Sequence, residues 1–287
     1  MRIEGPGSSN VEDRRGMSRG GKGILGGGIG MVILVVVGML FGIDPRVILG
    51  LAGTVETVQN MGASQQQVQG KAGPPSDEMG RFVAGVLADT EKTWGTLFQQ
   101  LGRQYRDPAL VLFTGATPTA CGTGQTAMGP FYCPLDQKVY IDLQFYQALR
   151  DKFRAPGDFA QAYVISHEVG HHVQNQLGIM QKMDEYRRRM SETQYNALSV
   201  RLELQADCFA GVWAHHAQNR NLLEAGDIEE AMRAASAIGD DTVQRRTQGR
   251  IVPDSFTHGS SEQRMRWFMT GMKSGQIAAC NTFEANI

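Results

Sequence analysis

Histidine and glutamate residues with a fixed spacing lie in the second half of the chain. The segment His167-Glu168-Val169-Gly170-His171 is an H-E-x-x-H motif. Positions i and i+4 of a helix share one face, so both imidazoles can reach the same metal ion, and this pattern is typical of zinc sites. Glu168 is expected beside the ion, where it can accept a proton from a water molecule that zinc activates. The motif predicts a Zn²⁺ site with His167 and His171 as ligands and Glu168 as catalytic acid and base.

A third ligand is expected, because a catalytic zinc ion usually has three protein ligands and one open position. The histidine extension H-E-x-x-H-x-x-G-x-x-H is absent, since positions 174 and 177 are glutamine and leucine. Further along, Glu203 and Asp207 form an E-x-x-x-D pattern like that of gluzincins. We expect Glu203 to bind zinc and Asp207, one turn later, to accept the second N–H of a liganding histidine. His215 or His216 is the alternative third ligand.

Two long helices are needed to bring these ligands together. Capping-box patterns, in which Ser or Asp precedes Gln or Glu by three positions, predict helix starts at Asp158, Ser191 and Asp227. The helix from Asp158 carries the H-E-x-x-H motif and is expected to end at Gly178, and the helix from Ser191 carries Glu203. The metal ligands should therefore face each other from two neighbouring helices.

Shorter elements are expected before these helices. An amphipathic helix is predicted from Ser76 to about residue 101, followed by short strands at Ala109–Phe113 and Lys138–Leu143. By analogy with other zincins, the second strand is expected at the edge of the sheet, where it would align an extended substrate. The predicted fold class is α+β and mainly helical, a zincin-like metallopeptidase domain with a small sheet.

An apolar run without charged residues extends from Gly23 to Ile43. Its length matches the roughly 20 residues that a helix needs to cross a bilayer, so it predicts one transmembrane helix, with a cleaved signal peptide or a buried helix as the alternatives. Basic residues are concentrated before the run, which places the N-terminus in the cytoplasm and the remainder of the chain in the periplasm or outside the cell. Two G-x-x-x-G spacings in the run indicate a homodimer contact.

Composition then divides the chain into four parts. Residues 1–22 are polar and rich in Gly, Ser and Arg, which indicates a disordered cytoplasmic tail. Residues 23–43 form the predicted span, residues 44–75 have the Gln, Gly and Pro content of a linker, and residues 76–287 form the zinc metallopeptidase domain. Lys and Arg number 28 against 29 Asp and Glu, so no electropositive surface for nucleic acid is expected.

Four cysteines lie in the predicted exported domain, namely Cys121, Cys133, Cys208 and Cys280. Disulfides persist outside the cytoplasm, and four cysteines allow three connectivities. Cys121 and Cys133 are close in sequence and are the favoured pair, while the pairing of the other two is left open. Free buried thiols are the alternative.

Several longer segments together resemble one bacterial family. GPFYCPLDQKVYIDLQFY, GDFAQAYVISHEVGHHVQ, ELQADCFAGVWA and THGSSEQRMRWF, with NVEDRRG before the glycine-rich run, are similar to the putative neutral zinc metallopeptidases. This resemblance implies His167 and His171 as ligands, Glu168 as acid and base, and Glu203 as the third ligand. It covers most of the chain apart from the linker, and it says more about fold and metal than about substrate.

Other candidate residues concern the oxyanion that forms during hydrolysis. The segment Thr257-His258-Gly259 resembles a T-H-P element of membrane-linked gluzincins, with glycine in place of proline. His258 is therefore a candidate hydrogen-bond donor to the oxyanion, with a surface-loop histidine as the alternative. Tyr163, one turn before His167, is a second candidate donor or else a core residue.

The favoured function is hydrolysis of peptide bonds in a peptide or protein substrate by a membrane-anchored zinc metallopeptidase. Two alternatives are a non-catalytic zinc-containing domain that binds envelope proteins and a zinc hydrolase of a non-peptide bond. Glu168 is not needed to hold zinc, so its presence favours an enzyme.

Overall fold

The computed structural model describes residues 1–3, 5–16, 70–73 and 75–287 of the chain. The predicted transmembrane run 23–43, its G-x-x-x-G contacts and most of the predicted linker lie outside these residues. Within the part that the structure describes, no helix combines the length and the apolar character that a membrane crossing requires.

A mixed sheet of five strands lies beside the helices, in the order β2-β1-β3-β7-β6. Strands β1, β3 and β7 are parallel, whereas β2 and β6 run antiparallel to their neighbours. A separate hairpin pairs β4 with β5. The strands are β1 Val11–Asp13, β2 Lys71–Ala72, β3 Ala109–Phe113, β4 Ala116–Thr119, β5 Gly122–Gln125, β6 Phe131–Cys133 and β7 Lys138–Asp142.

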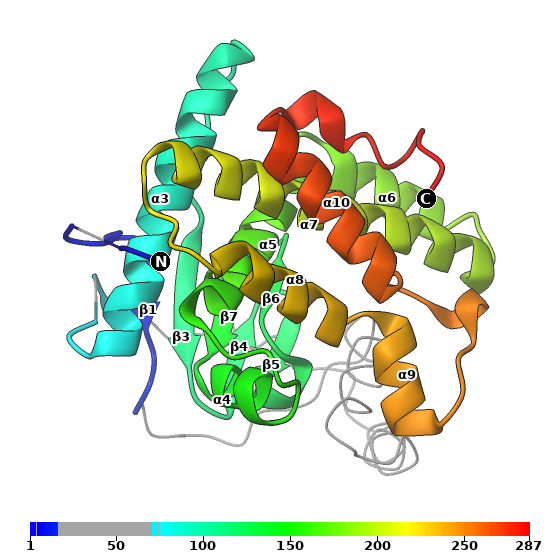
Figure 1. Cartoon of the computed structure of the whole chain (residues 1–287), viewed down its shortest axis with the longest axis horizontal. Helices are drawn as coiled ribbons and strands as arrows, with labels where there is room; N and C mark the ends of the chain where they lie inside the picture. The colour runs from blue at the N-terminus through cyan, green and yellow to red at the C-terminus, as the bar shows by residue number, and fades with distance from the viewer. Residues whose placement is uncertain (4, 17–69, 74) are drawn as a thin grey trace, which may run out of the picture.

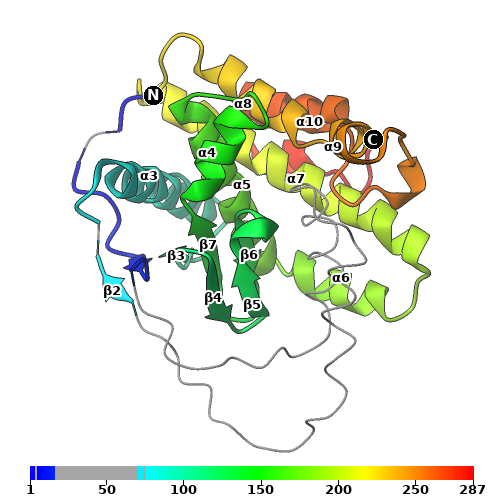
Figure 2. The same cartoon turned by 90° about the horizontal axis from the view of Figure 1, so that it is seen from below.

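Helices make up most of the remaining structure, which confirms a mainly helical α+β fold. They are α3 Glu78–Gln100, α4 Gln144–Asp151, α5 Asp158–Gln176, α6 Ile179–Arg187, α7 Glu192–Asn219, α8 Asp227–Ala237, α9 Asp240–Gln248 and α10 Ser261–Ser274. Single 3₁₀ turns occur at Thr126–Met128, Pro253–Ser255 and Ile277–Cys280. Helix α5 packs against α3, α7, α8 and strand β6, so it lies between the sheet and the other helices (Figures 1 and 2).

Helix starts agree only in part with the capping patterns. Ser191 and Gln194 form the predicted capping box at the start of α7. At α5 and α8 the N-caps are Gly157 and Gly226, without a side-chain cap. The expected boxes at Asp158 and Asp227 are therefore wrong, because both carboxylates instead bind the α-amino group of Met1, at 2.7 and 3.4 Å. Helix α3 begins after Asp77 rather than after Ser76, since Asp77 accepts the N–H of Gly80.

The edge of the sheet also differs from the expectation. Lys138–Asp142 is a strand, as predicted, but β7 lies inside the sheet between β3 and β6. The edge strand is β6, Phe131–Cys133. Its three residues are too few to show an alternating pattern, which is why it was not recognised in the sequence.

The first residues of the chain belong to the sheet. Val11 is 1% exposed, and β1 pairs with β3 through bonds such as Leu110 N–H to Asn10 O at 2.9 Å. The side chains of Ser8 and Asn10 both donate to Glu91 of α3. The expectation of a disordered tail over 1–22 is therefore wrong for its described residues, because polar composition does not reveal strand pairing with a distant partner.

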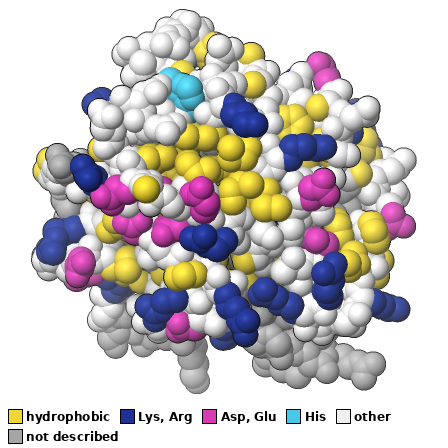
Figure 3. All heavy atoms as spheres, viewed as in Figure 1, with side chains coloured by type: hydrophobic (Ala, Val, Ile, Leu, Met, Phe, Trp, Pro, Cys, Tyr) yellow, Lys and Arg dark blue, Asp and Glu magenta, His cyan; other side chains and the backbone are white. Residues whose placement is uncertain are grey.

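Two disulfides link separate elements of the fold. Cys121 and Cys133 are bonded, as predicted, and tie the β4–β5 hairpin to the edge strand. Cys208 and Cys280 are the second pair and join α7 to the segment after α10. Acidic and basic side chains are interspersed on the face drawn in Figure 3, in keeping with the nearly balanced charge.

Candidate metal centre

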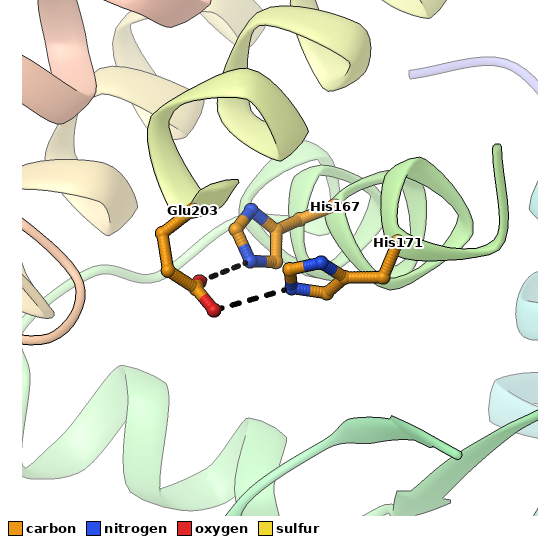
Figure 4. Close-up of side chains that lie close together, drawn as sticks. All are labelled: His167, His171 and Glu203. Atoms are coloured by element: carbon orange, nitrogen blue, oxygen red, sulfur yellow. Dashed lines mark hydrogen bonds and ion pairs between the residues drawn. The ribbon is translucent and has the colours of Figure 1, made fainter. Parts of the chain in front are cut away.

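Three side chains from two helices converge at one point. His167 and His171 of α5 and Glu203 of α7 each offer a ligand atom, and these atoms all lie within 4.8 Å of one another. The Glu203 carboxylate faces both imidazoles, with Oε2 at 3.2 Å from Nε2 of His167 and Oε1 at 3.5 Å from Nε2 of His171 (Figure 4). Two imidazoles and one carboxylate are a donor set of catalytic zinc sites.

The other nitrogen of each imidazole is already occupied. His167 Nδ1 lies 2.8 Å from Oδ1 of Asp207, and His171 Nδ1 lies 2.8 Å from Oε1 of Gln174. If each Nδ1–H donates to its oxygen, each Nε2 keeps its lone pair toward the shared centre, which is the tautomer that a metal requires. The residues therefore fit zinc. Asp207 has the predicted role in this geometry, whereas Gln174 was noted in the sequence only as a missing glycine.

Close packing of α5 on α7 sets the distance between the ligands. A Cβ atom on Gly170, inside the H-E-x-x-H motif, would lie 3.0 Å from the backbone oxygen of Ala206 and 3.1 Å from its Cα. A larger residue would push α7 away and move Glu203 from the histidines. Gly170 thus contributes to the site through packing, which the motif alone did not indicate.

A buried ion pair holds Asp207 in place. Arg264 of α10 donates to both oxygens of Asp207, at 2.9 and 3.0 Å, and the Tyr163 hydroxyl donates to Oδ1 at 2.5 Å. Burial would raise the pKa of Asp207, but Arg264 and His167 lower it to about 2. Asp207 is thereby kept ionised as the acceptor for His167. Tyr163 is fully buried and bonded here, so its expected alternative role as a core residue holds.

Glu168 is buried next to the ligands and keeps its carboxylate free of protein donors among the described residues. Burial raises the pKa of Glu168, while the charges of His167 and His171 oppose the increase. A carboxyl group without a fixed hydrogen-bond partner is free to accept a proton from a water molecule, which is what general-base catalysis needs.

An unpaired hydroxyl also belongs to this region. Tyr146 of α4 is 4% exposed, and its hydroxyl has no hydrogen-bond partner among the residues placed by the structure. Burial raises the pKa of Tyr146, and the charge of Glu168 raises it further, so the phenol stays protonated beside Glu168. Sequence analysis did not single out Tyr146, because one aromatic residue on a short helix looks like a core residue.

His258 lies in the loop before α10, at the border of the centre. Burial lowers the pKa of His258, but the negative charges of Glu203 and Asp240 raise it above its ordinary value. The backbone N–H groups of Thr257, His258 and Gly259 all donate to Oδ2 of Asp240. The structure thus brings His258 within the electrostatic influence of Glu203, and its role as a donor to the oxyanion stays a prediction.

The alternative third ligands are not part of the centre. His215 and His216 bind the backbone oxygens of Met272 and Gly275, at 2.9 and 3.0 Å, near the far end of α7. A second acidic group, of Asp158, Asp227 and Glu230, has the spacing of a metal site. The α-amino group of Met1 lies 2.7 Å from Asp158 and so supplies the positive charge there.

Comparison with known proteins agrees with this geometry. The model of one family, described as "Putative neutral zinc metallopeptidase", matches residues 1–283. The chain belongs to this family. Its resemblance to the family, noted from the sequence segments, is therefore confirmed, and a zinc peptidase is the general class of protein that the family description supports.

Relatives extend over nearly the whole chain. The Escherichia coli (strain K12) protein described as "Uncharacterized protein YpfJ" is 50% identical over 288 aligned residues, which cover 98% of this chain and 97% of that protein. The Mycobacterium tuberculosis (strain H37Rv) protein "Uncharacterized protein Rv2575" is 37% identical over 258 residues, with 86% and 85% covered. No solved structure matches this metallopeptidase-family chain.

Proposed function

We propose that the protein is a zinc-dependent peptidase that uses Glu168 as its acid and base. The observation that supports this proposal most directly is the orientation of the two imidazoles. Both Nε2 atoms face the Glu203 carboxylate while Asp207 and Gln174 occupy the Nδ1 atoms. A purely structural histidine pair would not need this arrangement, nor an unpaired carboxylate such as Glu168 beside it.

The bound zinc ion would polarise the scissile carbonyl and lower the pKa of water to roughly 7. Glu168 removes a proton from the attacking water and delivers it to the leaving amine. His258 donates a hydrogen bond to the carbonyl oxygen as negative charge develops there. Asp207 keeps His167 oriented, because its own charge is balanced by Arg264.

We propose that the substrate binds as an additional strand on β6. This strand pairs with β7 on one side only within the described sheet. The Tyr132 hydroxyl lies 2.9 Å from Nδ1 of His172 on α5, which holds β6 next to the helix that carries the ligands. An extended peptide can pair with such an edge through its main chain, with little demand on its sequence.

We further propose that the peptidase domain functions outside the cytoplasm, together with the N-terminal strand β1, which pairs with β3 of the same sheet. Two disulfides support the exported location, because such bonds are rare in the reducing cytoplasm. The apolar run 23–43 lies outside the described residues and stays a predicted membrane segment. Contact between two copies through its glycines stays a prediction.

Substitution of Glu168 by glutamine tests the enzyme proposal. The full-length chain in detergent would be loaded with zinc and assayed on a fluorescently labelled unfolded protein, and its metal would be measured by mass spectrometry. Glu168→Gln should keep about one zinc per chain and lose at least about a thousandfold in kcat/KM, because the side chain keeps its size but cannot accept the proton.

Glu91→Gln provides a matched control. Glu91 is also a partly buried carboxyl with a raised pKa, and it binds Ser8 and Asn10 instead of any residue of the centre. Glu91→Gln should retain activity. Stoichiometric zinc without hydrolysis in the wild-type chain would contradict the peptidase proposal and favour a zinc-containing domain that binds envelope proteins.

A further inference from the structure

The Asp240 carboxylate accepts three backbone hydrogen bonds from one loop. Asp240 is the first residue of α9, and its Oδ2 accepts the consecutive backbone N–H groups of Thr257, His258 and Gly259 at 2.7, 2.7 and 3.0 Å. Its own N–H donates to the backbone oxygen of Gly259 at 2.9 Å. Asp240 is 6% exposed, so these contacts form away from solvent. One carboxylate therefore determines the path of this three-residue loop.

The same loop packs on the helix that carries the third ligand. A Cβ atom on Gly259 would lie 3.1 Å from Cδ2 of Leu204 and 3.3 Å from Cγ1 of Val200. Leu204 follows Glu203 directly, and Val200 precedes it by about one helical turn. His258 is thus held beside Glu203 by a loop that cannot shift without losing contact with both α7 and Asp240.

The imidazole of His258 is oriented by the same groups. Its Nδ1 lies 2.9 Å from Oγ1 of Thr257 and 3.3 Å from Oδ1 of Asp240. Within the described structure no residue bonds Nε2 of His258. Nδ1 therefore faces two oxygen atoms, and Nε2 is the nitrogen available to a ligand.

We propose that Asp240 is a positioning residue of the peptidase, which holds the 257–259 loop with one oxygen and directs Nε2–H of His258 toward the substrate carbonyl with the other. This inference rests on the proposed function. It is supported by the two contacts of Nδ1, with Oγ1 of Thr257 and Oδ1 of Asp240, which leave Nε2 without a partner among the described residues.

Two substitutions separate the two tasks of Asp240. Asp240→Asn keeps an oxygen for the three loop amides but removes the charged acceptor for Nδ1–H, whereas Asp240→Ala removes both. Hydrogen exchange of a peptide covering residues 257–259 should stay slow in Asp240→Asn and become fast in Asp240→Ala. In the zinc-loaded full-length chain, Asp240→Asn should lose about tenfold to a hundredfold in kcat with little change in KM, and it should keep its zinc.

A double-mutant cycle with His258→Phe shows whether Asp240 acts through His258. His258→Phe should lose about a hundredfold or more in kcat, and Asp240→Asn should cause no further loss in that background. Asp241→Asn is the matched control, because the neighbouring carboxylate binds Ser261 instead, at 2.7 Å from its backbone nitrogen. This variant should retain the wild-type kcat.

The two proposals fail in distinguishable ways. Wild-type kcat in Asp240→Asn, or an equal loss with and without His258, would overturn the positioning role while Glu168→Gln still abolished hydrolysis. Absence of hydrolysis by the wild-type chain would overturn the peptidase and with it the task of His258. Slow exchange of the loop amides in Asp240→Ala would refute the claim that Asp240 holds the loop, whatever the activity.

Discussion

His171 and His172 are adjacent on α5 and both buried, yet they have opposite environments. His171 presents Nε2 to the Glu203 carboxylate at 3.5 Å, and although burial lowers its pKa, the charge of Glu203 raises it above the ordinary value. His172 lies between the Tyr132 hydroxyl at 2.9 Å and the backbone oxygen of Arg106 at 2.7 Å, and burial lowers its pKa to about 4. His171 keeps one ring nitrogen available beside a carboxylate, whereas both ring nitrogens of His172 have hydrogen-bond partners.

This difference shows what separates a metal ligand from a core histidine. Burial and helix position are nearly the same for the two residues. What differs is whether one nitrogen remains available and whether an anionic ligand atom lies opposite it. The segment H-E-x-x-H-H contains both His171 and His172. Their roles differ because other helices and strands supply different partners for the two imidazoles.

The largest expected effect comes from exchanging the two histidines separately. His171→Ala removes one of three ligands and should reduce zinc affinity by several orders of magnitude. His172→Gln should keep about one zinc per chain. Zinc titration against a fluorescent chelator measures both. Equal loss of zinc in the two variants would contradict the conclusion that His171 is a metal ligand and His172 is not.

The second expectation concerns acid stability of the metal-free protein. The pKa of His172 is lowered from 6.5 to about 4, so the unfolded chain binds more protons between these values and stability falls as pH decreases through that window. The loss approaches about 3 kcal/mol at pH 4, from about 1.4 kcal/mol per pKa unit. His167 acts in the opposite sense, since its raised pKa of about 10 stabilises the fold at low pH and this contribution is lost as pH rises.

Denaturant unfolding of wild-type and His172→Gln protein from pH 7 to pH 4 isolates the His172 contribution. The difference in unfolding free energy between the two proteins should shrink by up to about 3 kcal/mol over this range. A constant difference would mean that His172 is not kept neutral by its surroundings, and the contrast with His171 would lose its electrostatic basis.

The smallest expected effect concerns Asp207, which holds the proposed ligand His167 through its Nδ1 atom. Asp207→Asn retains an oxygen for His167 but removes the charge, and should weaken zinc binding by about tenfold to a hundredfold. Glu203→Ala should weaken it more, because it removes a ligand. The same chelator titration ranks the two variants. Zinc binding by Glu203→Ala at wild-type affinity would refute the proposed ligand set.

Sequence reasoning succeeded where the information is local. His167, Glu168 and His171 lie within one helical segment, and Glu203 and Asp207 within another, so helical spacing alone placed each group on a common face. Ser191 likewise marked the start of α7. Each of these predictions depends on residues only a few positions apart.

Contacts between distant segments were not recognised. Arg264 reaches Asp207 from α10, and Asp240 holds the His258 loop from α9, although neither belongs to a periodic pattern that points to the centre. At Asp158 a local pattern misled instead. The sequence has the spacing of a capping box there, but the carboxylate binds the α-amino group of Met1. Such pairings depend on tertiary packing, which a single sequence does not specify.

The pairing of β1 with β2 constrains the route of the chain across any bilayer. Glu12 lies opposite Ala72 and Asp13 opposite Lys71, so the strands before and after residues 17–69 are neighbours in one sheet. A bilayer cannot pass between hydrogen-bonded strands. A single crossing between β1 and β2, with a cytoplasmic N-terminus and an exported domain, would separate these paired strands and is incompatible with this sheet. Strand β1 therefore lies in the same compartment as the metal centre, because it belongs to the sheet of that domain.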